Sequence, residues 1–164
     1  MSFDTDAAFR ATYETALGSP DPSTQNGAIL YDFNGVELGR GCNEFPWGVN
    51  PVHWNDREAK YPRVVHAETA AILDAGRRGN STVGTVLVCP WAACSNCAKH
   101  IAYAGVSVLY RHPQITDGVF SNGRWHDECV LGDEIMREAG ITIVEFPVVS
   151  TDVRVRRNGE LWPA

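Results

Sequence analysis

The stretch PRVVHAETAAILDAGRRGNSTVGTVLVCPWAACSNCAKHIAYA, residues 62–104, predicts the centre of the fold. Pro62 suits the first turn of a helix, and residues 64–78 are rich in helix formers. Residues 83–89 form the continuous apolar run that is typical of a strand buried on both faces, and residues 95–104 again favour a helix. The stretch therefore predicts two helices joined through a buried strand.

On its N-terminal side, a helix and a hairpin precede this stretch. Apolar residues recur on one face of a helix over residues 6–17. Residues 28–33 and 36–42 favour strands, and Asn34-Gly35 between them is a preferred pair for a tight hairpin turn. Residues 43–62 show no period and contain several Pro and Trp, so we expect a long functional loop.

On the C-terminal side, residues 106–110 favour a strand, residues 112–125 a glycine-bearing loop, residues 127–139 a helix and residues 141–146 a strand. Because helices separate the last three strands, right-handed crossovers should make these strands parallel. The sequence predicts an α/β fold, a three-layer α/β/α sandwich around a mixed five-stranded sheet. We expect one domain over residues 1–164.

Composition narrows the classes of function. No run approaches the roughly 20 apolar residues of a membrane span, and the start MSFDTDAAFR lacks a basic leader, so we expect a soluble, cytoplasmic protein. Five cysteines, an odd number, suit metal binding in a reducing compartment better than a disulfide framework. The net charge of −6 argues against polymeric nucleic acid, although a single nucleotide remains possible.

One basic cluster lies in the tail, where Arg154, Arg156 and Arg157 alternate in part with valines. We interpret it as the solvated edge of a strand rather than a phosphate site.

Two short motifs open the two central helices: His66-Ala67-Glu68 and Cys94-Ser95-Asn96-Cys97. One His and two Cys thiolates supply the three protein ligands of a catalytic zinc site and leave a fourth position for water. A helix start favours the thiolate form of both cysteines. We expect Zn²⁺ bound by His66, Cys94 and Cys97.

Glu68 lies two residues after His66 and is the candidate general acid/base. Zinc lowers the pKa of a bound water towards neutrality, and a carboxylate nearby can carry its proton to a ring nitrogen and a leaving amino group. Glu68 is not expected to be a metal ligand.

The order H-x-E and then C-x-x-C resembles the zinc deaminases, in which a proline precedes the first cysteine. Ala93 stands at that proline position here. Residues 19–25, 41–46 and 60–68 further resemble deoxycytidylate (dCMP) deaminases of the cytidine deaminase-like superfamily. The resemblance covers most of the chain and implies hydrolytic deamination of dCMP to dUMP and ammonia.

The resemblance also implies roles for residues outside the two motifs. Asn43 would contact the sugar, the backbone of Ala67 would hold the pyrimidine carbonyl, and Trp125 matches an aromatic position near the base. Glu44 replaces a usual glycine and would bring a carboxylate close to the sugar or phosphate. A homo-oligomer, from dimer to hexamer, and a small-molecule nucleotide substrate are implied as well.

Other functions stay open at this point. A related deaminase could act on a 5-substituted dCMP, CMP, cytidine or another amino-heterocycle. A thioredoxin-like oxidoreductase also fits the C-x-x-C motif, but it leaves His66 and Glu68 without a role. A non-catalytic zinc module is the third possibility, and a transfer-RNA adenosine deaminase the fourth, against which the acidic charge speaks.

Overall fold

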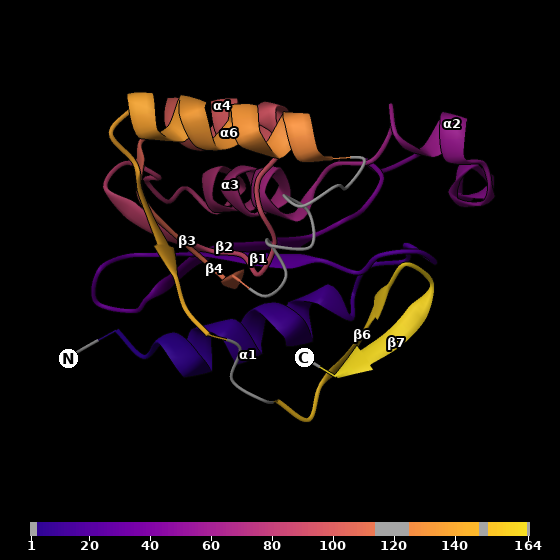
Figure 1. Cartoon of the computed structure of the whole chain (residues 1–164), viewed down its shortest axis with the longest axis horizontal. Helices are drawn as coiled ribbons and strands as arrows, with labels where there is room; N and C mark the ends of the chain where they lie inside the picture. Colours follow the sequence, from indigo (N-terminus) through magenta and orange to yellow (C-terminus); the bar gives the residue numbers. More distant parts are fainter. Residues whose placement is uncertain (1–2, 114–124, 148–150, 164) are drawn as a thin grey trace.

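A mixed five-stranded sheet forms the middle layer of the protein (Figure 1). The computed structural model describes residues 3–113, 125–147 and 151–163, so most of the predicted loop 112–125 lies outside the described residues. The strands follow the order β2-β1-β3-β4-β5. Their bounds are β1 Gly27–Tyr31, β2 Glu37–Cys42, β3 Thr85–Val88, β4 Val106–Arg111 and β5 Thr142–Glu145. β1 runs antiparallel to β2 and β3, whereas β3, β4 and β5 are parallel to one another, which confirms the predicted mixed sheet.

Helices cover both faces of this sheet (Figure 1). α1 packs on one face, and α3, α4 and α6 cover the other, so the predicted three-layer α/β/α sandwich is confirmed. Their bounds are α1 Thr5–Ala16, α3 Ala67–Arg77, α4 Ser95–Tyr103 and α6 His126–Glu138. In the described part of the chain, no helix has the length and apolar character needed to cross a membrane.

Two glycines of β2 set how closely α3 approaches the sheet. A Cβ atom added at Gly41 would lie 2.4 Å from the Cβ of Ala70, and one at Gly39 would lie 2.4 Å from the backbone nitrogen of Ala75. Both distances are shorter than real Cβ contacts, so only glycine fits there. The close approach fixes the distance between α3 and the sheet. It thereby also fixes the position of the first residues of α3 relative to the sheet.

The start of α3 differs from the prediction. The helix begins at Ala67 instead of near Pro62, because the backbone of Val65 pairs with Glu44 through hydrogen bonds of 2.8 and 3.1 Å. That pairing holds the chain extended up to His66, which becomes the N-cap residue of α3. The preceding loop also contains two short helices, η1 Pro51–Asn55 and α2 Arg57–Lys60, which its lack of period did not predict.

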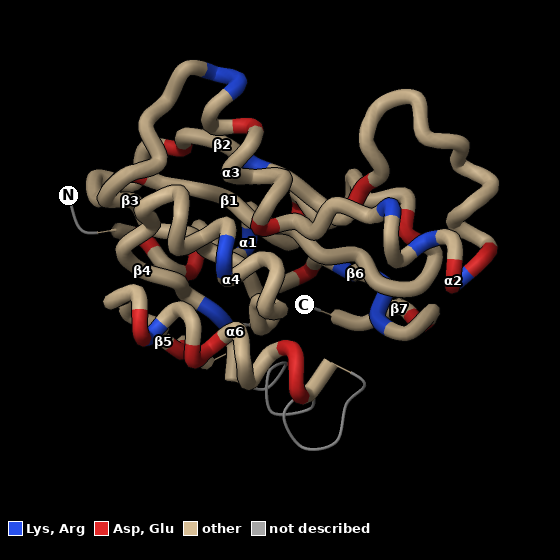
Figure 2. The backbone as a smooth tube through the Cα atoms, turned by 90° about the horizontal axis from the view of Figure 1, so that it is seen from above, with Lys and Arg blue, Asp and Glu red and all other residues tan. Residues whose placement is uncertain are grey.

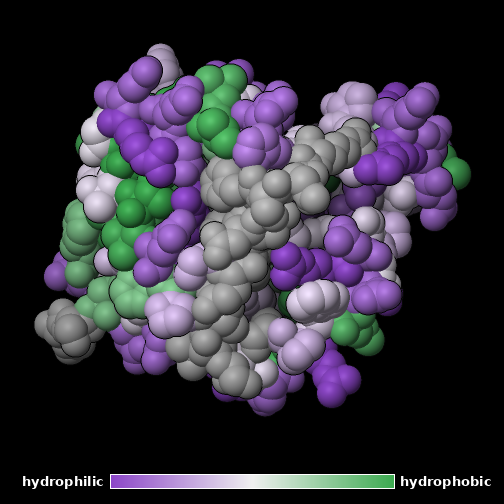
Figure 3. Space-filling view, viewed as in Figure 1, coloured by the Kyte–Doolittle hydropathy of each residue, from purple (hydrophilic) through white to green (hydrophobic). Residues whose placement is uncertain are grey.

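The tail forms a hairpin of two strands, β6 Arg154–Arg157 and β7 Glu160–Pro163 (Figure 1). Its turn uses Asn158 and Gly159, both at positive φ (53° and 85°). The hairpin and α2 lie at the same end of the molecule in Figures 1 and 2. The surface of that end is mostly hydrophilic in Figure 3.

Candidate active site

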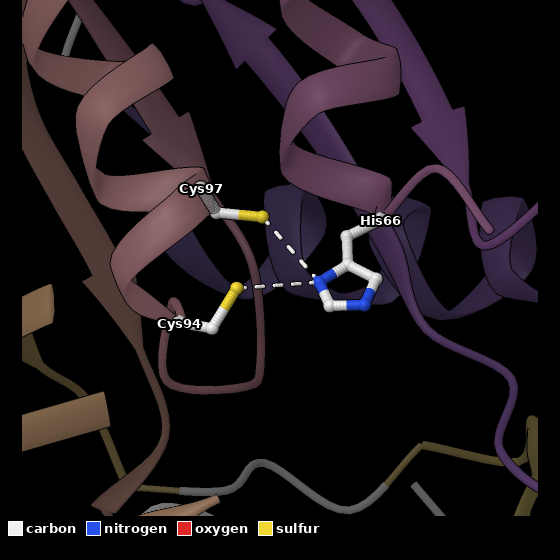
Figure 4. A group of neighbouring side chains, drawn as sticks. All are labelled: His66, Cys94 and Cys97. Atoms are coloured by element: carbon white, nitrogen blue, oxygen red, sulfur yellow. Dashed lines mark hydrogen bonds between the residues drawn. The ribbon is translucent and has the colours of Figure 1, made fainter. Parts of the chain in front are cut away.

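Three metal-binding side chains converge between the starts of α3 and α4 (Figure 4). His66 is the N-cap of α3, Cys94 is the N-cap of α4, and Cys97 lies in the first turn of α4. The Nδ1 atom of His66 lies 3.5 Å from each sulfur, and the three ligand atoms all lie within 4.8 Å of one another. Two helix N-termini therefore point at one spot, where their dipoles favour anionic sulfur.

The spacing of these atoms fits zinc. Tetrahedral Zn²⁺ with its usual Zn–S and Zn–N bonds places a sulfur and a nitrogen about 3.5 Å apart, which matches the separation found here. Hydrogen bonding from Cys97, and then from His66, lowers the pKa of the Cys94 thiol and so favours its thiolate form. Cys97 is fully buried, whereas Cys94 and His66 also line a cavity, which leaves room for a fourth ligand on that side.

Glu68 lies beside this site in the first turn of α3. Its side chain is buried, and within the described residues its Oε2 atom has no hydrogen-bond partner. Burial raises the pKa of Glu68 to about 7, against the opposing charge of His66. A carboxyl group with a pKa near neutrality suits both acceptance and donation of a proton. The buried Oε2 atom, which has no partner among the described residues, is also expected where a carboxyl group will hydrogen-bond to a bound water or ligand.

A contact behind the sulfur atoms supports the site. The hydroxyl of Thr69 lies 3.6 Å from the sulfur of Cys97 and 2.9 Å from Nδ1 of His100. His100 is exposed, so it supports the site from the surface of α4. Hydrogen bonds to metal ligands from residues that do not bind the metal themselves orient those ligands.

His66 and Cys94 line a cavity of about 660 Å³, a size typical of small-molecule sites. Asn43 and Trp125 line the cavity. The indole of Trp125 meets the His66 ring edge to face at 5.9 Å. The cavity therefore joins an aromatic wall to the metal-binding residues.

Ala67 and Glu44 are not among the residues that line this cavity. The backbone N–H of Ala67 donates to Oδ1 of Asn43 at 3.1 Å, so a substrate carbonyl would have to share or replace that bond. Glu44 uses its backbone to pair with Val65. The carboxylate that the sequence placed near a phosphate is therefore not part of the cavity wall.

Several charged and aromatic residues of the cavity had no assigned role in the sequence. Lys60 donates to Asp21 at 2.8 Å in a buried ion pair, and both residues line the cavity. Trp91 and Arg157 line it as well. The interpretation of the basic tail as a solvated edge fits Arg154 and Arg156, which are exposed, whereas the half-buried Arg157 lines the cavity. The tail does contain a usable signal, since Asn158-Gly159 predicts a tight turn.

Comparisons with known proteins agree with this geometry. The family model described as the cytidine and deoxycytidylate deaminase zinc-binding region matches residues 2–112. An uncharacterised deaminase in the luxG 3′ region of Aliivibrio fischeri is 33% identical over 131 residues, which cover 79% of this chain and 84% of that protein. The deoxycytidylate deaminase of Mus musculus is 28% identical over 141 residues, which cover 80% of this chain and 73% of that protein.

Solved structures show the same fold. The dCMP deaminase from the cyanophage S-TIM5 in apo form superposes with a TM-score of 0.64 at 22% identity, over 87% of this chain and 96% of that chain. A second structure of the S-TIM5 protein, in complex with dCMP and dUMP, superposes with a TM-score of 0.61. At this identity the likeness shows the architecture alone.

Proposed function

This chain belongs to the cytidine and deoxycytidylate deaminase family, and from that premise we propose that it hydrolyses dCMP to dUMP and ammonia with zinc as its cofactor. Membership of the family makes it an aminohydrolase with a zinc-binding region. The observation that carries the proposal is the convergence of His66, Cys94 and Cys97 beside the buried carboxyl of Glu68, on one side of a cavity of about 660 Å³.

Each residue at this end of the cavity has a role in the proposed reaction. His66, Cys94 and Cys97 hold the metal. When bound, zinc lowers the pKa of a water that it coordinates and so supplies the nucleophilic oxygen at neutral pH. Glu68 takes a proton from the attacking water and delivers it to N3 of the cytosine ring, and it carries the second proton to the departing amino group. The water oxygen becomes the C4 carbonyl of uracil, and ammonia leaves.

The remaining residues would orient the nucleotide. Asn43 is held by two hydrogen bonds, from the N–H of Ala67 and to the carbonyl of Thr24 (3.1 and 3.3 Å), which fix its amide at the cavity wall, where it would contact the sugar. Trp125 packs against His66 and would cover the base. A fixed amide and a fixed ring position the reacting carbon before the chemistry begins.

The proposal extends to the state of the protein in the cell. The family resemblance implies a homo-oligomer, from dimer to hexamer, which sedimentation of the purified protein would test. We also propose a cytoplasmic enzyme that acts on free nucleotides, in line with its net charge of −6.

The test is turnover measured by ultraviolet absorbance on protein whose zinc content has been assayed. The substrates are dCMP, CMP, deoxycytidine and 5-methyl-dCMP, and Glu68→Ala is the control. We expect dCMP to be converted fastest, with no turnover above background by Glu68→Ala. Wild-type protein that holds zinc and converts none of the four would contradict the proposed substrate and point to another amino-heterocycle.

A further inference from the structure

Arg157 brings to the cavity a cation that has no anionic partner among the described residues. Its guanidinium carbon lies 4.9 Å from the ring centre of Trp91 and 4.8 Å from that of Trp162. An indole offers an N–H donor but no acceptor lone pair, so neither ring uses the donors of the guanidinium. Among the described residues, Arg157 has no carboxylate or carbonyl partner. Its hydrogen-bonding capacity is therefore free for a ligand.

The hairpin that carries Arg157 is fixed to the cavity wall. The backbone N–H of Gln25 donates to the carbonyl of Arg156 at 2.9 Å, and Oε1 of Gln25 accepts from the N–H of Arg156 at 3.0 Å. In the turn of the hairpin, the N–H of Gly159 donates to the carbonyl of Ser23 at 2.8 Å. Because Ser23 lines the cavity too, the hairpin and the cavity wall form one hydrogen-bonded unit.

Apart from Glu68, no carboxylate that lines the cavity lacks a cationic partner among the described residues. Lys60 and Asp21 neutralise each other in their ion pair, and Glu68 lies beside the metal ligands. Among the described residues that line the cavity, Arg57 of α2 is the second cation without a carboxylate partner, and it lies over the ring of Tyr61 at 5.8 Å. α2 and the hairpin lie at the same end of the molecule in Figure 2, and Arg57 and Arg157 both line the cavity.

We propose that Arg157 binds the 5′-phosphate of the substrate and makes the enzyme select nucleotides over nucleosides. The inference rests on the proposed function and adds to it the group that recognises the phosphate. A phosphate monoester is an oxygen-rich anion, and a planar guanidinium with free N–H donors is the side chain that binds such groups through paired hydrogen bonds. The indoles of Trp91 and Trp162 hold the guanidinium in place, which lowers the entropy lost on binding.

The test compares a nucleotide with its nucleoside in Arg157→Gln. We expect kcat/KM for dCMP to fall about 10- to 100-fold, the loss of a charge-assisted contact, mainly through KM. Turnover of deoxycytidine should stay unchanged. Arg156→Gln is the matched control, since it removes the same charge from an exposed neighbour on the same strand and should change neither substrate. Equal losses for dCMP and deoxycytidine in Arg157→Gln, or no loss for dCMP, would overturn the inference.

Calorimetric binding of the product dUMP and of deoxyuridine separates this inference from the proposed function. Arg157→Gln should weaken dUMP binding by the same factor and leave deoxyuridine binding unchanged, whether or not the protein turns over dCMP. Equal affinity of the wild type and the variant for dUMP would overturn the role of Arg157 even if deamination is found. Should Arg157→Gln fail to fold, Arg157→Met takes its place, because an unbranched apolar side chain can still pack on the two indoles.

Discussion

The cavity wall contains two groups of residues, named here the metal end and the hairpin end, and they are built in different ways. The metal end, formed by His66, Glu68, Cys94 and Cys97, comes from the first turns of two helices, and its ligands His66 and Cys94 are only 28 positions apart. The hairpin end, formed by Asp21, Lys60, Trp91 and Arg157, joins distant segments, since the bond between Gln25 and Arg156 spans 131 positions. Short motifs therefore determine the chemistry, whereas the recognition of the rest of the substrate depends on how distant segments of the chain meet.

The largest effect should come from the metal end. Cys97→Ser removes a fully buried ligand, so we expect loss of bound zinc and of all turnover. Metal analysis of the purified variant and the dCMP assay check this. Cys129→Ser is the matched control, because Cys129 is also a buried cysteine at the cavity but lies outside the ligand group. Zinc retained by Cys97→Ser, or lost equally from both variants, would contradict the ligand assignment.

The second prediction separates chemistry from metal binding. Glu68→Gln keeps the shape of the side chain but cannot carry a proton, so kcat should fall about 10²- to 10⁴-fold. Zinc content should equal that of the wild type, because Glu68 is not a ligand in our assignment. If the variant is purified without zinc although its fold is intact, the separation of roles at the metal end is wrong.

The third prediction concerns stability at the hairpin end. Asp21→Ala leaves the buried ammonium of Lys60 without its partner, so the free energy of unfolding should fall by about 3–5 kcal/mol. Urea unfolding measures the change. Glu14→Gln breaks an exposed ion pair with Arg10 and should cost no more than about 1 kcal/mol. Similar losses of unfolding free energy in the two variants would show that the buried Asp21–Lys60 pair contributes no more to stability than an exposed pair.

The smallest effect should come from the link between hairpin and wall. Gln25→Ala removes the side-chain bonds to the N–H of Arg156 and the carbonyl of Ser19 (3.0 and 3.1 Å), while the backbone bond from Gln25 to Arg156 remains. We expect a loss of about 1–2 kcal/mol in unfolding free energy. Faster hydrogen exchange of the β6 amides and a raised KM for dCMP would report it. An unchanged KM together with faster exchange would mean that the hairpin moves without affecting the substrate.

The sequence predicted the parts of the fold that local patterns determine. Helix and strand periods gave the mixed sheet and its two helical layers, and Asn34-Gly35 gave the first hairpin. The predicted start of α3 was wrong, because the pairing of Val65 with Glu44 joins residues that no local pattern connects. The charge pattern of the tail does not predict the second hairpin, whereas Asn158-Gly159, the same turn signal as Asn34-Gly35, does.

In the site, too, local sequence patterns predict some features, whereas others depend on tertiary contacts. The convergence of His66, Cys94 and Cys97 could be predicted because each begins or follows a helix start. The bond between Asn43 and the N–H of Ala67 could not, since the two residues meet only through the tertiary fold. For the same reason Glu44, next to Asn43 in sequence, does not reach the cavity wall.

The most direct test of the account is a crystal structure of the zinc-loaded Glu68→Ala variant with dCMP. The metal ligands are assigned to the base and Arg157 to the phosphate of one nucleotide, and the Glu68→Ala variant should bind dCMP without converting it. We predict that C4 of the cytosine faces the metal held by His66, Cys94 and Cys97, and that the phosphate contacts Arg157. A base bound away from the metal, or a phosphate that points away from the hairpin with Arg157 still on its tryptophans, would contradict the account.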